Sequence, residues 1–435
     1  MEIDQSLLKR LALNLSEILI PVSEINRETW SVIACDQHTS NPEYWERVAD
    51  LRKGNPSTYD LILPEAYLSG DDEECINTIQ KTMKDYLHKN YFHSKKQGLV
   101  YIQRYTQLSG LRQGIIASID LEQYEFSPDR KSLIRATEKI IPERILPRKK
   151  IRQNAALELS HSILLIADKK QHVIESLKHK TQIMEKIYDF ELMMNGGQLK
   201  GYWLDDPETI NTMLQNLSQL PIDETTSPDS PFLFAVGDGN HSLAAAKELW
   251  EDIRDNQLTN DPEKRKNHPA RYAMVEIINI YNSGISLESI NRCLFNIDPN
   301  DFFALLTESK IPYKQVLSDF KEALSWHQNG ALMYSQKKWY LIENFGEGLV
   351  CETIDRLLDT CRKTYPGTKI DYIHGWDHTR ELAEASADRV SIFFNPLRHE
   401  ELFALVAKHG VLPRKAFSIG TTEEKRYYFE ARRIQ

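Results

Sequence analysis

A polar turn between an apolar run and a helix-like pattern holds the residue types in this chain that are best suited to chemistry. The run "PFLFAV" precedes the turn, "LAAAKELWED" follows it, and the turn itself consists of Gly237, Asp238, Gly239, Asn240, His241 and Ser242. Glycines on both sides of Asp238 allow positive φ and close approach by a ligand. A helix that begins after such a turn presents unpaired N–H groups, which suit a phosphate or a carboxylate. The turn therefore predicts an anion site.

The side chains of this turn have both a chemical and a structural interpretation. Asp238 could hold a metal ion or act as a base, and Asn240 and His241 could contact phosphate oxygens or move a proton. In the structural alternative, Asp238 caps the helix and His241 is simply exposed. The spacing GxxxxGK[ST] is absent, so the turn is not a P-loop.

The arginine-rich segment "SLIRATEKIIPERILPRKKIRQ", residues 132–153, is a second candidate for binding an anion. Its candidate residues are Arg135, Glu138, Arg144, Arg148 and Arg152. Guanidinium groups bind phosphates and carboxylates through two hydrogen bonds at once, so these arginines could converge on an anionic substrate. A solvated charged helix and loop is the alternative. Pro142 and Pro147 predict that the segment is not one continuous helix.

The stretch "ACDQHTSNPEYW" places polar residues at the end of a short apolar strand pattern, which is where ligands bind in open α/β sheets. Asp36 could act there as an acid, a base or a metal ligand. Cys35 is the weaker candidate, because His38 would have to turn back to activate it and neighbouring strand residues face opposite ways.

Another cluster, in "DYIHGWDHTREL", has the composition of a metal site. His374 and His378 have the i, i+4 spacing that puts two histidines on one face of a helix, and Asp377 lies between them. Gly375 interrupts the pattern, and no glutamate follows His374 as HExxH requires. A structural histidine before a helix capped by Asp377 is the alternative.

Strand and helix patterns mix along the whole chain, which predicts an α/β to α+β fold with mixed sheets and helices. Asn41-Pro42 and Asp206-Pro207 are typical helix starts. The strand patterns on both sides of residues 108–111 predict a hairpin. A strand and then a helix are expected over residues 161–190, and residues 415–434 predict a closing hairpin.

The length of 435 residues predicts two domains, since one hydrophobic core seldom serves so long a chain. The polar, proline-bearing stretch 255–270 is the best candidate for a linker or a long surface loop. We therefore expect an N-terminal α/β domain over residues 1–255, with the anion site, and a C-terminal α+β domain over residues 270–435.

Composition and charge argue against several classes of protein. Lys and Arg total 54 against 63 Asp and Glu, a net charge of -9, which argues against a dedicated nucleic-acid-binding protein. No apolar run reaches the roughly 18 residues of a membrane helix, and the N-terminus has the pattern of an amphipathic helix without a signal peptide's basic start. The five cysteines form no CxxC pair, as expected for free thiols in a reducing cytoplasm.

Five stretches together resemble the bacterial domain-of-unknown-function family 1015 (DUF1015), from about residue 20 to the C-terminus. They are "IACDQHTSNPEYW", "RATEKIIPERILPR", "GDGNHSLAAAK", "DYIHGWD" and "GVLPRKAFSIGTTEEKRYYFEARRI". The family implies no activity. The turn is also similar to the Asp-Gly-His-His-Arg motif of the ParB-like fold, which includes free-serine kinases and nucleotide-binding partition proteins. In this chain Asn240 replaces the first histidine and Ser242 the arginine.

The second resemblance implies a ParB-like element around the turn and a cytoplasmic phosphotransferase. Its phosphoryl donor would be ATP or ADP with Mg²⁺, held with Asp238, and its acceptor a small hydroxyl metabolite, serine first. Gly239, Asn240 and Ser242 would bind phosphate, and Asp36 would activate the hydroxyl. The alternative is a non-enzymatic regulator that binds a nucleotide or metabolite; neither function involves a nucleic acid or a membrane.

Overall fold

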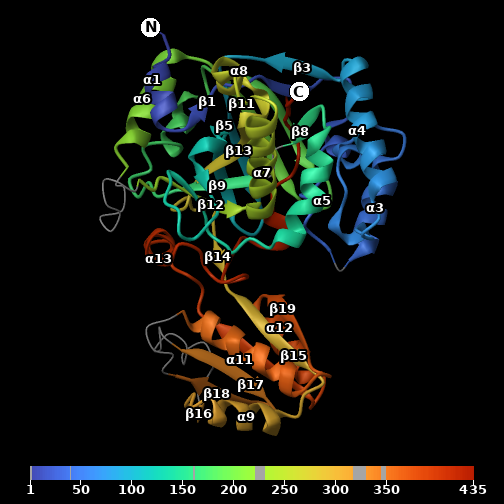
Figure 1. Ribbon diagram of the computed structural model, residues 1–435, viewed down its shortest axis with the longest axis vertical. Coiled ribbons are helices and arrows are strands. Elements are labelled where there is room, and N and C mark those ends of the chain that lie inside the picture. Colours follow the sequence, from blue (N-terminus) through green and yellow to red (C-terminus); the bar gives the residue numbers. More distant parts are fainter. Residues whose placement is uncertain (1, 40, 160–161, 221–230, 317–329, 344–348) are drawn as a thin grey trace. The chain divides into compact units, whose positions relative to one another are not determined.

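The computed structural model describes residues 2–39, 41–159, 162–220, 231–316, 330–343 and 349–435 of the chain (Figure 1). Two compact units are present. Unit 1 comprises Met1–Ser286, Phe403–Val411 and Thr422–Gln435, and unit 2 comprises Leu287–Leu402 and Leu412–Thr421. The expected division between residues 255 and 270 stays a prediction about domains, whereas the contacts divide the chain after Ser286 and return its C-terminus to unit 1.

Unit 1 is built mainly on two sheets. Its strands are β1 (Leu13–Asn14), β2 (Ile18–Pro21), β3 (Phe92–Lys95), β4 (Leu99–Thr106), β5 (Gly110–Asp120), β6 (Tyr124–Glu125), β7 (Ile134–Ala136), β8 (Leu157–Leu159), β9 (Ser162–Ile166), β10 (Glu185–Leu192), β11 (Gly197–Leu204), β12 (Phe234–Asp238), β13 (Tyr272–Asn279) and β22 (Ala431–Arg433). Ten of them form one sheet within the described residues, in the order β10-β11-β4-β5-β13-β9-β12-β7-β6 with β1 beside β5.

That large sheet is mixed. β12 and β7, β13 and β9, and β6 and β7 pair in parallel, whereas the other neighbours are antiparallel. The mixed α/β architecture expected from the sequence is therefore present. The hairpin expected around residues 108–111 is also confirmed, because β4 and β5 pair antiparallel across it.

Helices flank these sheets. The α-helices of unit 1 are α1 (Gln5–Arg10), α2 (Arg27–Trp30), α3 (Pro42–Arg52), α4 (Glu73–His88), α5 (Pro142–Gln153), α6 (Pro207–Ser218), α7 (Asn240–Asn256), α8 (Pro262–Asn267) and, from Phe403 on, α13 (Glu401–His409). The 3-10 helices are η1 (Thr58–Leu61), η2 (Glu65–Tyr67), η3 (Leu121–Gln123), η4 (Glu175–Lys180), η5 (Pro269–Arg271) and η6 (Thr422–Glu424). Both expected Pro-marked starts are confirmed: Asn41 caps α3 and Asp206 caps α6.

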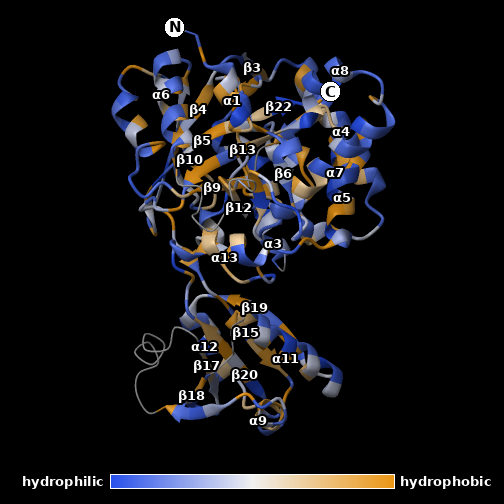
Figure 2. Cartoon of the chain, turned by 60° about the vertical axis from the view of Figure 1, so that its left-hand side comes forward, coloured by the Kyte–Doolittle hydropathy of each residue, from blue (hydrophilic) through white to orange (hydrophobic). Residues whose placement is uncertain are grey.

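The alternation of side chains along the strands separates two cores. Ile115, Ala117 and Ile119 of β5 face one core, whereas Ile116 faces the other. Successive strand residues point to opposite faces, so a strand buried on both sides has a nearly continuous apolar sequence. The colouring of Figure 2 shows this apolar character along β5, β13 and β9.

Three expectations about elements are wrong for local reasons. The amphipathic N-terminal helix, expected over residues 1–19, covers only Gln5–Arg10, and β1 follows it. The helix expected within residues 161–190 is only the 3-10 helix η4, which buries Leu177 alone and so lacks an apolar face. Residues 415–434 form no hairpin: β21 pairs with β14, and β22 pairs with β2 and β8.

The C-terminal segment is instead inserted between other parts of unit 1. Tyr428 and Phe429 are fully buried, and the backbone nitrogen of Tyr428 donates to Val32 O, 2.8 Å away. Residues buried on both sides need partners on both sides, which a two-stranded hairpin does not provide. The four-stranded sheet β3-β2-β22-β8 results.

Unit 2 contains a six-stranded sheet in the order β16-β18-β17-β20-β15-β19. Its strands and helices are β14 (Leu287–Glu288), β15 (Ile290–Phe295), α9 (Pro299–Glu308), β16 (Tyr313–Val316), β17 (Ala331–Ser335), β18 (Lys338–Ile342), α11 (Val350–Thr364), β19 (Lys369–His374), α12 (Trp376–Glu384), β20 (Arg389–Phe394) and β21 (Ser418–Ile419). The neighbouring strands of this sheet are antiparallel, as expected for an α+β arrangement.

Candidate functional site

The expected strand-to-helix turn is present, and glycine is required in it. Asp238 ends β12, α7 begins at Asn240, and Gly239 between them has φ of 79°. A Cβ atom at Gly239 would lie 2.7 Å from Ser162 Oγ and 2.9 Å from Ser162 Cα. The neighbouring strand β9 therefore closes one side of the turn. Gly239 is the N-cap residue of α7, and no side chain caps the N–H groups of its first turn.

The polar side chains at the start of α7 hold the beginning of the arginine-rich segment. Asn240 Oδ1 accepts a hydrogen bond from the backbone nitrogen of Thr137 at 3.1 Å. His241 Nε2 accepts one from the backbone nitrogen of Ile141 at 3.2 Å. His241 is buried, so the alternative in which it is exposed is wrong. The turn and the arginine-rich segment, far apart in sequence, are thus parts of one local structure.

Asp238 is not a helix cap but half of an ion pair. Its Oδ1 accepts from the backbone nitrogen of Gly239 at 3.0 Å, and its Oδ2 lies 3.4 Å from Lys425 Nζ. The Lys425 side chain is 8% exposed. Sequence reasoning missed Lys425, because its segment was assigned to a hairpin and no local motif links it to residue 238.

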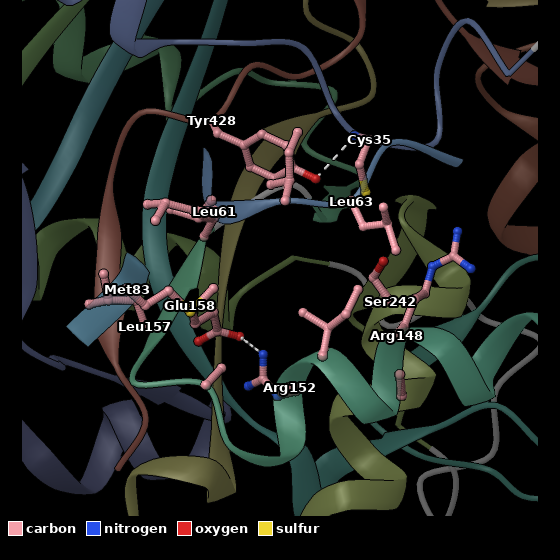
Figure 3. Close-up of a pocket in the computed structure, with 15 residues that line it drawn as sticks. Cys35, Leu61, Leu63, Met83, Arg148, Arg152, Leu157, Glu158, Ser242 and Tyr428 are labelled. Atoms are coloured by element: carbon pink, nitrogen blue, oxygen red, sulfur yellow. Dashed lines mark hydrogen bonds and ion pairs between the residues drawn. The ribbon is translucent and has the colours of Figure 1, made fainter. Parts of the chain in front are cut away.

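The chain forms a cavity of about 110 Å³ beside the first turns of α7 (Figure 3). Its lining residues are Cys35, Leu61, Ile62, Leu63, Met83, Arg148, Ile151, Arg152, Ala155, Leu157, Glu158, Leu159, Ser242, Ala245 and Tyr428. Of the residues expected at a site, Arg148 and Arg152 come from α5 and Ser242 from α7. Neighbouring helices place these three around one space, because α5 and α7 pack side by side.

Two carboxylates beside this cavity each lie between two arginines. Glu65 pairs with Arg144 at 2.7 Å and with Arg148. Glu158 pairs with Arg152 Nη1 at 2.6 Å and with Arg432 Nη2 at 2.7 Å. Each group has two guanidinium charges against one carboxylate charge, so each leaves a surplus of one positive charge. Sequence reasoning did not find Glu65, Glu158 or Arg432, which no spacing connects to the arginines of α5.

Burial and charge set the protonation of these groups. Burial acts to raise the pKa of Glu158, but the charges of Arg152 and Arg432 outweigh it and hold that pKa below its usual range. Burial raises the pKa of the Cys35 thiol, which keeps it protonated and weakens it as a nucleophile. Tyr428, whose hydroxyl accepts from the Cys35 backbone nitrogen at 3.1 Å, also has its pKa raised by burial.

Three other candidates do not line the cavity. Asp36 follows Cys35 in a turn, half-buried, and its Oδ1 accepts from Gln37 Nε2 at 2.9 Å. The Arg135 guanidinium donates to the carbonyls of residues 132 and 231 and lies 4.6 Å from the ring centre of Phe232. Glu138 is half-buried in the loop between β7 and α5.

The metal site considered in unit 2 is not formed. His374 ends β19, and His378 on α12 is exposed, with its Nδ1 3.9 Å from Glu381 Oε2. Nowhere in the described part of the chain do three or more His, Cys, Asp or Glu side chains gather as a metal site would need. Asp238 belongs to no such group. None of the helices in the described ranges could cross a membrane, given their lengths and polarity.

Comparison with known proteins gives a family but no activity. The family model described as "Protein of unknown function (DUF1015)" matches residues 19–361, and no curated protein matches the chain. Among solved structures, a conserved hypothetical protein from Pyrococcus furiosus is 11% identical with a TM-score of 0.39, over 70% of this chain and 90% of that one.

Two solved complexes of a free serine kinase are similar to the same degree. The complex with AMP is 11% identical with a TM-score of 0.40, and the complex with ADP is 10% identical with a TM-score of 0.41. Each comparison covers 71% of this chain and 88% of the kinase. Likenesses this distant carry no argument about what this chain binds.

Proposed function

The chain belongs to the DUF1015 family, and we propose that it is a nucleotide-dependent phosphotransferase acting on the hydroxyl group of a small metabolite. The observation that carries this proposal is the cavity at the start of α7, which Ser242, Arg148 and Arg152 line together. Phosphoryl transfer depends mostly on positioning and on neutralising charge, and a helix start with surplus guanidinium charge offers both.

In this proposal the start of α7 holds the transferred phosphate. Backbone N–H groups of the first turn and Ser242 contact its oxygens, while Arg148 lowers the energy of the developing charge. Lys425 supplies a cation at the turn, where Ser242 occupies the place of the arginine in the ParB-like motif. His241 and Asn240 position this turn through their bonds to the arginine-rich segment.

The reaction needs a base and a divalent ion. The acceptor oxygen bonds to the terminal phosphorus of ATP or ADP as the bond from that phosphorus to the bridging oxygen breaks. The hydroxyl proton passes to Asp36, which follows the lining residue Cys35 and would receive it at the edge of the cavity. Mg²⁺ would neutralise the phosphates; it commonly takes only one or two protein carboxylates, and Asp238 would serve after exchanging its pairing with Lys425.

Phosphorus NMR tests the proposal on the full chain with Mg²⁺, ATP or ADP, and a pool of small hydroxyl metabolites that includes serine. We expect a new phosphomonoester signal that disappears in Asp238→Ala. Arg148→Met should slow its formation by about 100-fold, whereas Lys149→Met, on the same helix but outside the cavity, should change it by less than about two-fold. Equal rates in the Arg148 and Lys149 variants would contradict the role of the cavity.

A second function is favoured by one observation. Asp238, Asn240 and His241 all hold other parts of the protein, as expected of a turn that binds a ligand without reacting with it. A regulator of this kind would bind nucleotide or metabolite saturably and leave the phosphorus spectrum of the nucleotide unchanged.

A further inference from the structure

We propose that the cavity binds the acceptor as a small hydroxycarboxylate, an organic acid without an amino group, and that it discriminates against amino acids such as serine. This inference rests on the proposed phosphotransferase function and names the substrate class of the same site. It follows from the size of the cavity, the charge around it and the chemistry of its walls.

The volume of the cavity indicates which of the two substrates it holds, the acceptor or the nucleotide. A cavity of about 110 Å³ corresponds to three or four molecules of liquid water, at about 30 Å³ each. It is smaller than the closed cavity of about 150 Å³ that holds benzene, so its volume suits a small acid better than a purine base. The nucleotide therefore stays outside, and a three- or four-carbon acid fills the cavity with its hydroxyl end toward the mouth.

The surplus charge selects an anion. The Arg144–Glu65–Arg148 and Arg152–Glu158–Arg432 groups leave one positive charge each beside the same small space. The carboxylate of Asp36, whose charge acts on the lining residues Cys35 and Tyr428, offsets one of the two, so a net positive charge remains. Opposite charge favours a carboxylate there, and low exposure makes that attraction stronger than it is in water.

The Arg152 side chain also has an unused hydrogen-bonding edge. Its Nε and Nη2 atoms are buried and find no hydrogen-bond partner among the described residues. Elsewhere in the chain the same edge of Arg292 binds the Asp355 carboxylate, with Nε 2.9 Å and Nη2 3.0 Å from its oxygens. A ligand carboxylate would supply the missing acceptors at Arg152, after the guanidinium turns its covered edge toward the cavity.

An ammonium group has no comparable partner among the described residues that line the cavity. Glu158 carries the one carboxylate among the described lining residues, and two arginines already hold it. The rest of the wall is largely apolar, with Leu61, Leu63 and Leu157 facing the space in Figure 3. Burying a cation next to surplus positive charge and leucine side chains is unfavourable.

Glycerate and serine form a matched pair of probes, because they differ only in a hydroxyl or an ammonium group at the second carbon. We would titrate the full chain with each, without nucleotide, by calorimetry. Glycerate should bind at least about ten-fold more tightly than serine, and Arg152→Met should remove that preference, whereas Lys149→Met should keep it. Equal binding of the two probes to the unsubstituted protein, or no binding of glycerate, would overturn the inference.

A second variant tests the inference independently, in case Arg152→Met does not fold. Leu63→Ala enlarges the cavity without changing a charge, so it should raise the affinity for 2-hydroxyisovalerate relative to glycerate by about ten-fold. An unchanged ratio would contradict the location of the acid. If glycerate binds as expected but is never phosphorylated, the phosphotransferase function is wrong and the acid-binding cavity is supported. If serine is phosphorylated and glycerate is not, the phosphotransferase function is supported and the preference for an acid without an amino group is wrong.

Discussion

The Nε2 atom of His241, in the first turn of α7, accepts a hydrogen bond from the backbone nitrogen of Ile141, which precedes α5. The bond spans 3.2 Å and joins the starts of the two helices that supply Ser242 and Arg148 to the cavity. His241 therefore holds the starts of α5 and α7 together without lining the cavity itself.

This bond makes a prediction about two substitutions of His241. His241→Ala leaves the N–H of Ile141 without its acceptor in a partly buried position, which should lower the free energy of unfolding by about 1–2 kcal/mol. His241→Gln restores an acceptor at similar reach and should recover most of that loss. Urea unfolding followed by circular dichroism measures both, and equal losses in the two variants would show that the hydrogen bond is not what matters.

The close contact between Gly239 and Ser162 predicts that the turn has no room for a side chain at position 239. Gly239→Ala places a residue with a Cβ at φ of 79° and forces that atom against Ser162. Gly54→Ala is the matched control, since Gly54 has φ of 82° and nothing within 4 Å of the added atom. The control should lose about 1 kcal/mol of unfolding free energy from the backbone alone, and Gly239→Ala at least about 1 kcal/mol more.

Glu158 gives a prediction about pH. Its pKa is lowered in the folded protein, so the carboxylate contributes stability above the usual carboxyl range, and that stability is lost as the pH falls through the lowered pKa. Glu158→Gln should destabilise the protein by about 3–5 kcal/mol near neutral pH, because two buried arginines lose their counter-charge.

The difference between unsubstituted protein and Glu158→Gln should then shrink as the pH falls below the usual glutamate pKa of about 4.3 and through the lowered pKa of the folded protein, below which the carboxyl group is neutral in both states. Urea unfolding at several pH values checks this. A difference that stays constant over that range would contradict a charged Glu158.

Lys425 gives a prediction about nucleotide binding. If it contacts phosphate beside Asp238, Lys425→Met should weaken the binding of ADP with Mg²⁺ by about ten-fold, and the affinity should also become less dependent on salt. Lys264→Met is the control, because Lys264 is exposed and pairs only locally with Asp261. Fluorescence or calorimetric titration compares them, and parallel losses in the two variants would remove Lys425 from the site.

Local signals in the sequence determined the parts of this protein that depend on neighbouring residues. Alternating apolar residues on both sides of 108–111 predicted the hairpin of β4 and β5, and Asn41-Pro42 and Asp206-Pro207 marked two helix starts. The change from an apolar run to Gly239 predicted the turn before α7, because the positive φ that glycine allows is a local property of the backbone.

Tertiary structure alone decided which charges meet. Glu65 and Arg148, or Asp238 and Lys425, are separated by long stretches of chain, and no periodicity of 2 or 3.6 residues connects them. The C-terminal segment shows the reason: its buried residues fit either a hairpin or an inserted strand, and only the partners available on both sides selected the second. Local pattern predicts an element, whereas burial and charge pairing between distant segments determine where that element packs and which site it completes.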